Sequence, residues 1–203
     1  MYRGNGPRIF PIIVVIIVIA LVIAALVSIA RLVFFSGNST DRSNTTGDQK
    51  VNIRDEVLKT TQERAVRYTI RGPIVADENF RSYQITITPT HRSMTVYRGY
   101  LENPIETKSY DNNTRAYEQF VYALDKADIA KTRDAKEQDL RGVCANNGRA
   151  YKFEVMDNGV TKEALWTSTC DGSKGSMAAN MLQVHQLFAN QIPDFKPVFD
   201  KVQ

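Results

Sequence analysis

The first pattern along the chain is an apolar run, Ile9–Ala30, that contains no charged residue. A helix of about 22 residues is about 33 Å long, which is enough to cross the hydrocarbon core of a bilayer once. Pro11 falls in the first turn, where its missing N–H costs little, so we expect the helix to begin near it. The sequence predicts a transmembrane anchor over residues 9–35 that contacts the lipid bilayer through Ile9 to Ala30.

Basic residues near this run predict its orientation. Arg3 and Arg8 lie in the leading residues 1–8, which contain no acidic side chain, while Arg31 and Arg42 follow the run. Because basic residues favour the cytoplasmic side, we expect a single-pass signal-anchor in the cell membrane, with a cytoplasmic N-terminus and an extracytoplasmic C-terminal domain. A signal peptide cleaved after Ala30 is the alternative, although the run is longer than a usual signal-peptide core.

The residues that follow the anchor are polar. Residues 36–50 are rich in Ser, Thr, Asn, Gly and Asp and contain no large apolar side chain. Such a stretch cannot form a core, so we expect a flexible Ser/Asn/Thr tether. The sequence then predicts one folded domain over residues 51–203, because about 150 residues suffice for a single core.

Within this domain the apolar positions recur with strand and helix periods. An imperfect helical pattern, Val51–Ala65, leads into the domain, and β-branched or alternating runs predict strands at Val66–Ile70, Tyr83–Thr88 and Met94–Tyr100. Apolar residues at three- and four-residue steps predict helices at Thr114–Ala127, capped by Asn112, Asn113 or Thr114, and at Met177–Gln191, capped by Ser176. Phe195 and Phe199 in the tail are expected to pack back onto the domain.

A tight-turn signal, Asp157-Asn158-Gly159, predicts a β-hairpin within Tyr151–Cys170. If Asn158 and Gly159 form the loop, the opposed residues are Val155 and Lys162, Phe153 and Ala164, and Tyr151 and Trp166. That register places the aromatic side chains on one face. The expected fold class is therefore α+β: an antiparallel sheet of about five strands packed with two main helices.

The two cysteines of the chain, Cys144 and Cys170, lie near the open end of this hairpin. In an oxidising compartment they are expected to form a disulfide. A closed loop of about 27 residues would stabilise the domain by roughly 3–4 kcal/mol in the chain-entropy model.

The formal net charge of +4 does not indicate a nucleic-acid partner. Arg3, Arg8 and Arg31 flank the anchor, and removing them from the 26 basic residues leaves 23 against 22 acidic ones, or +1. Nucleic-acid binding requires a concentrated basic face, so no nucleic acid is expected as a partner.

Candidate chemistry is sparse. His91 and His185 are the two histidines of the chain, and neither has Cys, Asp or Glu at metal-ligand spacing. Cys144 and His185 could form a thiol–imidazole pair, but the disulfide is the favoured interpretation of Cys144. The segment Gly172-Ser-Lys-Gly-Ser lacks the spacing of a P-loop and is interpreted as a turn. We therefore predict no catalytic residue, no cofactor and no metal ligand.

Aromatic side chains offer a candidate binding surface instead. Tyrosine gives contact area at low entropic cost, and aromatic residues are enriched at interfaces. The residues considered for this surface are Tyr97, Tyr100, Tyr110, Tyr122 and Phe80.

Four segments of the domain, together with the basic anchor and the tether, carry a resemblance to other proteins. The segments are Ile70-Arg-Gly-Pro-Ile, Gly142-Val-Cys, Leu165-Trp-Thr-Ser-Thr-Cys and Leu187-Phe-Ala-Asn-Gln-Ile-Pro. The chain resembles an uncharacterised family of single-pass, membrane-anchored extracytoplasmic proteins of reduced-genome bacteria, to which no activity is assigned. The resemblance implies a bacterial cell-surface location and nothing about mechanism.

These features favour a non-enzymatic binding or interaction module at the cell surface, with a protein or envelope component as its partner. An extracytoplasmic hydrolase acting on cell-wall or peptide substrates is the first alternative. A structural subunit of an envelope or secretion assembly is the second.

Overall fold

The structure, a computed structural model, describes residues 52–135 and 139–200, which belong to one compact unit, Lys50–Gln203. The predicted cytoplasmic tail, anchor and tether lie outside the described residues. In the described ranges, no helix combines the length and the apolar character that crossing a bilayer requires.

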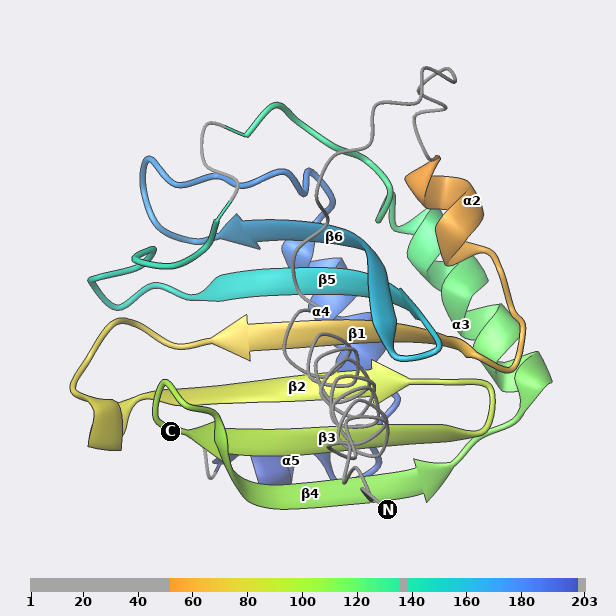
Figure 1. Cartoon of the computed structure of the whole chain (residues 1–203), viewed down its shortest axis with the longest axis horizontal. Coiled ribbons are helices and arrows are strands. Elements are labelled where there is room, and N and C mark those ends of the chain that lie inside the picture. Colours follow the sequence, from red (N-terminus) through yellow and green to blue (C-terminus); the bar gives the residue numbers. More distant parts are fainter. Residues whose placement is uncertain (1–51, 136–138, 201–203) are drawn as a thin grey trace, which may run out of the picture. The chain divides into compact units, whose positions relative to one another are not determined.

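The centre of the domain is a six-stranded antiparallel sheet with the order β4-β3-β2-β1-β5-β6 (Figure 1). Its strands are β1 Arg64–Arg71, β2 Arg81–Ile87, β3 His91–Arg98, β4 Asn103–Asp111, β5 Ala150–Asp157 and β6 Val160–Ser168. The predicted α+β class is confirmed, but the sheet has one strand more than the five expected. The additional strand, β4, lies at an edge and is largely exposed, so it has no buried face to produce a regular apolar alternation.

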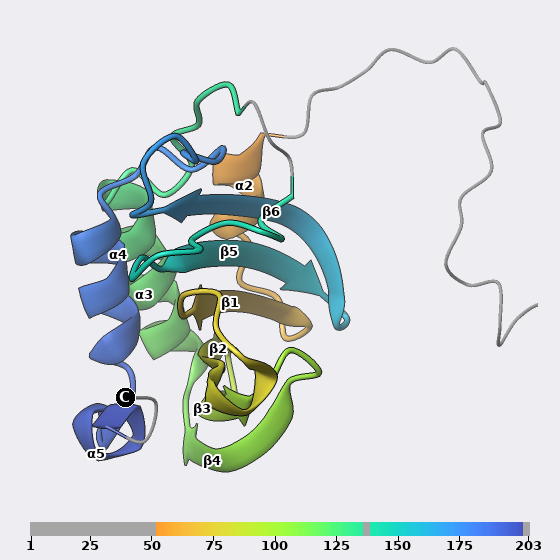
Figure 2. The same cartoon turned by 90° about the vertical axis from the view of Figure 1, so that its left-hand side faces the viewer.

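The longer helices lie on one side of this sheet (Figure 2). The helical segments are α2 Ile53–Val57, the 3-10 turn η1 Asp77–Asn79, α3 Thr114–Lys126, α4 Met181–Ala189 and α5 Phe195–Phe199. The predicted cap of α3 is confirmed at Asn113, whose side chain accepts a hydrogen bond from the Ala116 backbone N–H at 3.0 Å.

Helix α4 begins four residues later than the sequence pattern suggested, and its cap is Asn180 rather than Ser176. The Asn180 side chain accepts from the backbone N–H of Gln183 at 3.2 Å. Met177 instead donates its backbone N–H to the Trp166 carbonyl at 2.9 Å and forms an isolated bridge with Thr132. Pairing with β6 therefore keeps this segment extended.

The core fills the space between the sheet and the helices. Alternate residues of β1, among them Tyr68, turn toward the helices, and α3 buries an apolar stripe that includes Phe120. Phe188 of α4 stacks on Tyr68, with ring centroids 4.9 Å apart, and meets Phe120 edge-on at 5.0 Å. Phe195 and Phe199 pack against this core, as predicted. Burying each large apolar side chain contributes roughly 1.5–3 kcal/mol.

The β5–β6 hairpin has the predicted two-residue loop but not the predicted register. Asn158 and Gly159 both have positive φ, 51° and 76°, as a type I′ turn requires. A bulge then leaves Lys162 unpaired, so that Val155 faces Glu163, Phe153 faces Leu165 and Tyr151 faces Thr167.

The one-residue shift moves the tryptophan to the other face of the sheet. Trp166 lies opposite Lys152 and packs with Val143 and Cys144 instead of joining Tyr151 and Phe153. The predicted gathering of these aromatic side chains on one face is therefore wrong.

The predicted disulfide is confirmed. Cys144 and Cys170 are bonded, with their Cα atoms 5.4 Å apart. Gly148 makes room for the bond, because a Cβ at this position would collide with the Cys170 sulfur. The disulfide and Trp166 together fix the loop that precedes β5.

Candidate functional site

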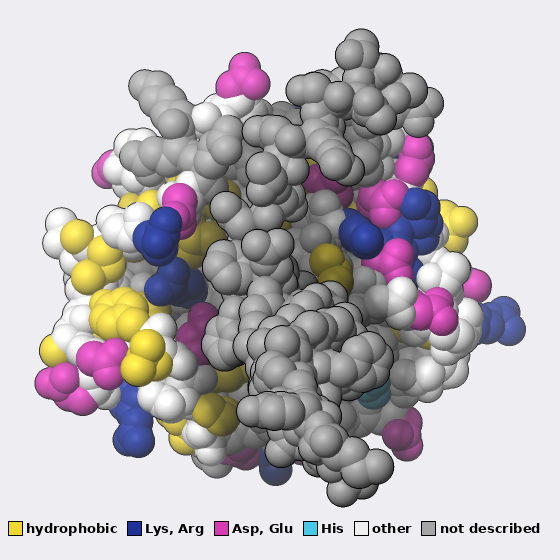
Figure 3. All heavy atoms as spheres, in the orientation of Figure 1, with side chains coloured by type: hydrophobic (Ala, Val, Ile, Leu, Met, Phe, Trp, Pro, Cys, Tyr) yellow, Lys and Arg dark blue, Asp and Glu magenta, His cyan; other side chains and the backbone are white. Residues whose placement is uncertain are grey.

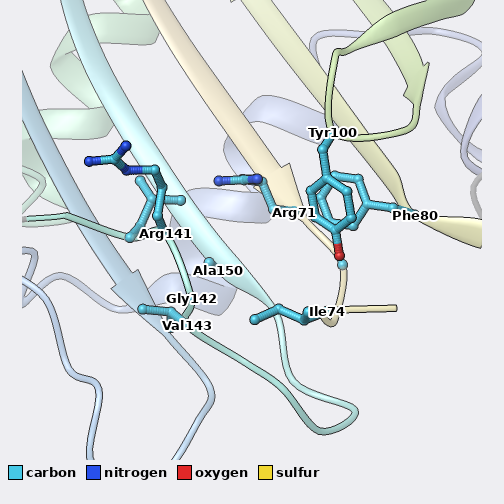
Figure 4. Close-up of a pocket in the computed structure, with 10 residues that line it drawn as sticks. Arg71, Ile74, Phe80, Tyr100, Arg141, Gly142, Val143 and Ala150 are labelled. Atoms are coloured by element: carbon cyan, nitrogen blue, oxygen red, sulfur yellow. The ribbon is translucent and has the colours of Figure 1, made fainter. Parts of the chain in front are cut away.

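A pocket of about 380 Å³ lies at the end of the sheet where β1 and β3 finish and β5 begins (Figure 4). The β1–β2 connection, residues 72–80, forms one wall together with the β3–β4 turn. The loop residues 140–143 form the other wall. Segments from distant parts of the sequence therefore meet at one site.

Two aromatic rings form the first wall. Phe80, only 2% exposed, stacks on Tyr100 with ring centroids 4.1 Å apart and an interplanar angle of 18°. The guanidinium carbon of Arg71 lies 5.3 Å from the centre of the Phe80 ring. This is a cation–π arrangement, so the cation and both rings form a continuous stack at the pocket edge.

Hydrogen bonds hold Tyr100 in place. Its hydroxyl donates to the Val75 carbonyl at 2.8 Å and accepts from the Val75 N–H at 3.0 Å. Its own backbone N–H donates to the Asp77 carboxylate at 2.7 Å. Gly99, at a φ of 74°, lies so close to Asp77 that a Cβ would come within 2.8 Å of that carboxylate. The aromatic wall is thus fixed without a ligand.

A hydrogen bond connects the second wall to the first, and the disulfide connects the second wall to the end of β6. The backbone N–H of Ile74, in the first wall, donates to the Cys144 carbonyl at 2.9 Å. Val143 packs with Cys144 and Trp166, and Cys144 is tied to Cys170. The position of this wall therefore depends on the disulfide.

The charged side chains that line the pocket are Arg71 and Arg141. Arg141 forms an ion pair with Asp139, and its backbone N–H donates to the same carboxylate at 2.9 Å. These bonds lower the pKa of Asp139, and the positive charge of Arg71 contributes a smaller lowering. Within residues 52–135 and 139–200, no carboxylate forms an ion pair with Arg71. Among these residues, Arg71 is therefore held by the Phe80 ring and by a longer-range attraction to Asp139 rather than by an ion pair.

Exposed apolar side chains continue outward from the pocket. We name them the apolar rim: Ile74, Val75, Tyr100 and Leu101, which are 39%, 40%, 38% and 87% exposed. Figure 3 shows apolar side chains gathered at this end of the described surface. A cluster of this kind, beside a preformed pocket, is typical of an interaction site.

The structure brings together two of the five aromatic residues considered from the sequence. Phe80 and Tyr100 form the pocket wall. Tyr97 lies on β3 beside the core residue Val96 and, by strand alternation, on the opposite face. The Tyr110 hydroxyl donates to Asp194 at 3.1 Å, and Tyr122 is exposed on α3. Neither Tyr110 nor Tyr122 lines the pocket.

Sequence reasoning missed the two arginines of the pocket. Arg71 ends a strand and Arg141 lies in a charged connection, so neither belongs to a periodic pattern. The available signal was the Gly-Pro pair after Arg71, which marks a loop, and loops on a rigid scaffold often carry binding residues.

The histidines lie apart from each other. His91 begins β3, with its Nδ1 3.0 Å from the Thr88 hydroxyl, and His185 lies on α4, with its Nδ1 3.5 Å from the Tyr83 hydroxyl. Cys144 is disulfide-bonded, which excludes the thiol–imidazole pair with His185. Among the described residues, no three His, Cys, Asp or Glu side chains are grouped to hold a metal ion.

The described pocket therefore offers apolar contact area and positive charge. Its lining residues include two arginines and one tyrosine, but no histidine, cysteine, serine, aspartate or glutamate. Such a lining can make apolar and charge-assisted contacts with a ligand. The chain matches no protein-family model and no curated protein.

Proposed function

We propose that this domain is a non-enzymatic binding module, held at the extracytoplasmic face of the cell membrane, that contacts a protein or envelope partner through the pocket and its apolar rim. The observation that carries the proposal is a pre-ordered aromatic wall that continues into exposed apolar side chains. The apolar run Ile9–Ala30 and the polar residues 36–50 support a tethered arrangement at a membrane.

The energetic argument rests on exposed apolar area. Leu101 is 87% exposed, so leaving it in water forgoes most of the roughly 1.5–3 kcal/mol that burying a leucine side chain contributes. Beside a preformed pocket, such residues stabilise a complex because the wall they adjoin needs little ordering on binding. A partner that covers the rim recovers this free energy.

The test uses full-length protein in membranes of the source organism, with chemical crosslinking, purification and mass spectrometry. Leu101→Asp places a charge on the rim without disturbing the core. Leu182→Asp is the matched control, because Leu182 is 74% exposed on α4 and lies outside the rim. We expect Leu101→Asp to reduce capture of the specific partner about tenfold or more, which corresponds to about 1.4 kcal/mol.

The control should capture the partner as the unmodified chain does. Equal capture by the unmodified chain and Leu101→Asp would refute the proposed contact surface. Turnover of a cell-wall or peptide substrate that persists in Leu101→Asp would favour the hydrolase alternative.

A further inference from the structure

We infer that the pocket receives the C-terminal residue of a partner polypeptide, with the apolar side chain of that residue inside the pocket and its carboxylate at Arg71. This inference rests on the proposed function, since it names the chemical class of the partner at the same site.

The interior of the pocket suits an apolar side chain. Ile74 and the Tyr100 ring present exposed carbon surface, with the buried Phe80 and Val143 behind them. The Tyr100 hydroxyl is already used by both polar groups of the Val75 backbone. At about 380 Å³, the cavity lies near the small end of the roughly 300–1,000 Å³ range of ligand pockets. It is suited to a terminal residue rather than to a long segment.

The edge of the pocket suits a carboxylate. Arg71 is held at the end of β1 between Ser82 and Ala150, and its guanidinium lies over the Phe80 ring. A planar guanidinium with several N–H donors is the usual bidentate partner of a carboxylate. Asp139 forms its ion pair with Arg141, so among the described residues the Arg71 guanidinium has no carboxylate bound to it.

The surroundings favour a polypeptide over a small acid. The apolar rim extends beyond the pocket, and Leu101 is its most exposed member. A small carboxylic acid would fill the pocket and leave the rim in water. A polypeptide that ends in the pocket has preceding residues to cover it.

The experiment measures peptide binding by full-length protein in nanodiscs, with subtraction of the signal from empty nanodiscs. The probes are fluorescein-labelled Gly-Leu-Leu-Phe with a free C-terminal carboxylate and the identical peptide with a C-terminal amide. We expect the acid to bind about five- to tenfold more tightly, as charge-assisted hydrogen bonds at a partly exposed guanidinium imply. The preference should shrink as salt is raised.

Variants assign this preference to residues. Arg71→Gln should make the acid and the amide bind alike, and Arg71→Lys should restore part of the preference through charge alone. Arg115→Gln on α3, where Arg115 is exposed, is the matched control and should keep the full preference. Urea unfolding of each variant verifies that the fold is retained.

Each contrary outcome is decisive. Equal binding of acid and amide by the unmodified chain, or no binding of either peptide, overturns the inference. Decanoate that competes as well as the peptide acid overturns the polypeptide assignment. None of these results tests the proposed function, which the separate Leu101→Asp experiment addresses. A failure of the inference can therefore be distinguished from a failure of the proposed function.

Discussion

Among individual residues, His185 has the most informative surroundings outside the pocket. It is partly buried on α4, with its ring centroid 6.2 Å from that of Tyr68 and its Nδ1 3.5 Å from the Tyr83 hydroxyl. Burial lowers its pKa from the ordinary value of 6.5, and the positive charge of Arg149 lowers it further. Burial also raises the pKa of Tyr68 and Tyr83, so these hydroxyls stay protonated. The imidazole is therefore held neutral in a largely apolar environment.

This environment predicts a loss of stability in mild acid. As pH falls through 6.5, His185 becomes protonated in the unfolded chain but stays neutral in the folded chain until its own lower pKa is reached. The unfolded chain then binds more protons, so the free energy of unfolding decreases as pH falls through this window. We expect His185→Gln to flatten that decrease, measured as urea midpoints between about pH 7 and 5.

The matched control is His91→Gln, at the exposed β2–β3 turn, which should retain the dependence that His185 causes. Carboxylates with lowered pKa values, such as Glu56 beside Lys59 and Arg64, lose their contribution at lower pH, below about 4.5. An unchanged slope in His185→Gln would refute the assignment.

Individual residues also show how much of the candidate site could be predicted from the sequence. Phe80 and Tyr100 were candidates because aromatic side chains favour interfaces wherever they occur. Arg71 and Arg141 acquire their role only because the β1–β5 pairing and the disulfide bring their segments together. Tyr110 was also a candidate, but its hydroxyl bonds to Asp194 of the C-terminal segment. An alternating pattern could not predict that contact.

At the scale of elements, prediction succeeded where one face is buried. Helix α3 and strands β1, β2 and β3 follow their expected periods because their apolar sides meet the core. Edge strand β4 was missed because it has little buried surface. The hairpin loop was predicted from the Asn158-Gly159 pair, but the bulge at Lys162 has no comparable local signal.

The bulge leads to a prediction about the segment that follows β6. Trp166, turned to the second face, lies so close to Gly175 that a Cβ there would collide with its indole ring and its carbonyl. We therefore expect Gly175→Ala to push this segment away from β6 and to weaken the Met177 hydrogen bond to Trp166. We expect a loss of about 2–3 kcal/mol, measured by urea unfolding.

Gly159→Ala provides the comparison. Gly159 has a φ of 76° but open space around its Cα, so alanine there meets only backbone strain, at a cost of about 1 kcal/mol. A Gly175→Ala variant as stable as Gly159→Ala would show that the segment beside Trp166 yields without cost.

For the whole molecule, the disulfide anchors one wall of the pocket, and a hydrogen bond connects that wall to the other. The aromatic wall comes from the first half of the described chain, whereas the opposite wall precedes β5. The Ile74 N–H bond to Cys144 connects the walls, and Cys144 is bonded to Cys170 beyond β6. Breaking the disulfide should therefore affect global stability and the pocket together.

The variant that tests this coupling is Cys144→Ser/Cys170→Ser. The bonded cysteines are separated by 26 positions in sequence. We therefore expect the free energy of unfolding to fall by about 3–4 kcal/mol in the chain-entropy model. Hydrogen exchange at the Ile74 amide should accelerate more than at the Tyr83 amide, which lies inside the sheet between β1 and β3.

A dithiol reductant should reproduce both effects in the unmodified chain and change nothing in the double variant. The variant could lose stability while the Ile74 amide stays protected from hydrogen exchange. In that case the packing of Val143 and Trp166 is enough to keep the wall in place, and the pocket does not depend on the disulfide. If both are lost, the site persists only where disulfides persist, as outside the cytoplasm. That result would tie the integrity of the pocket to the compartment that the apolar run at the N-terminus predicts.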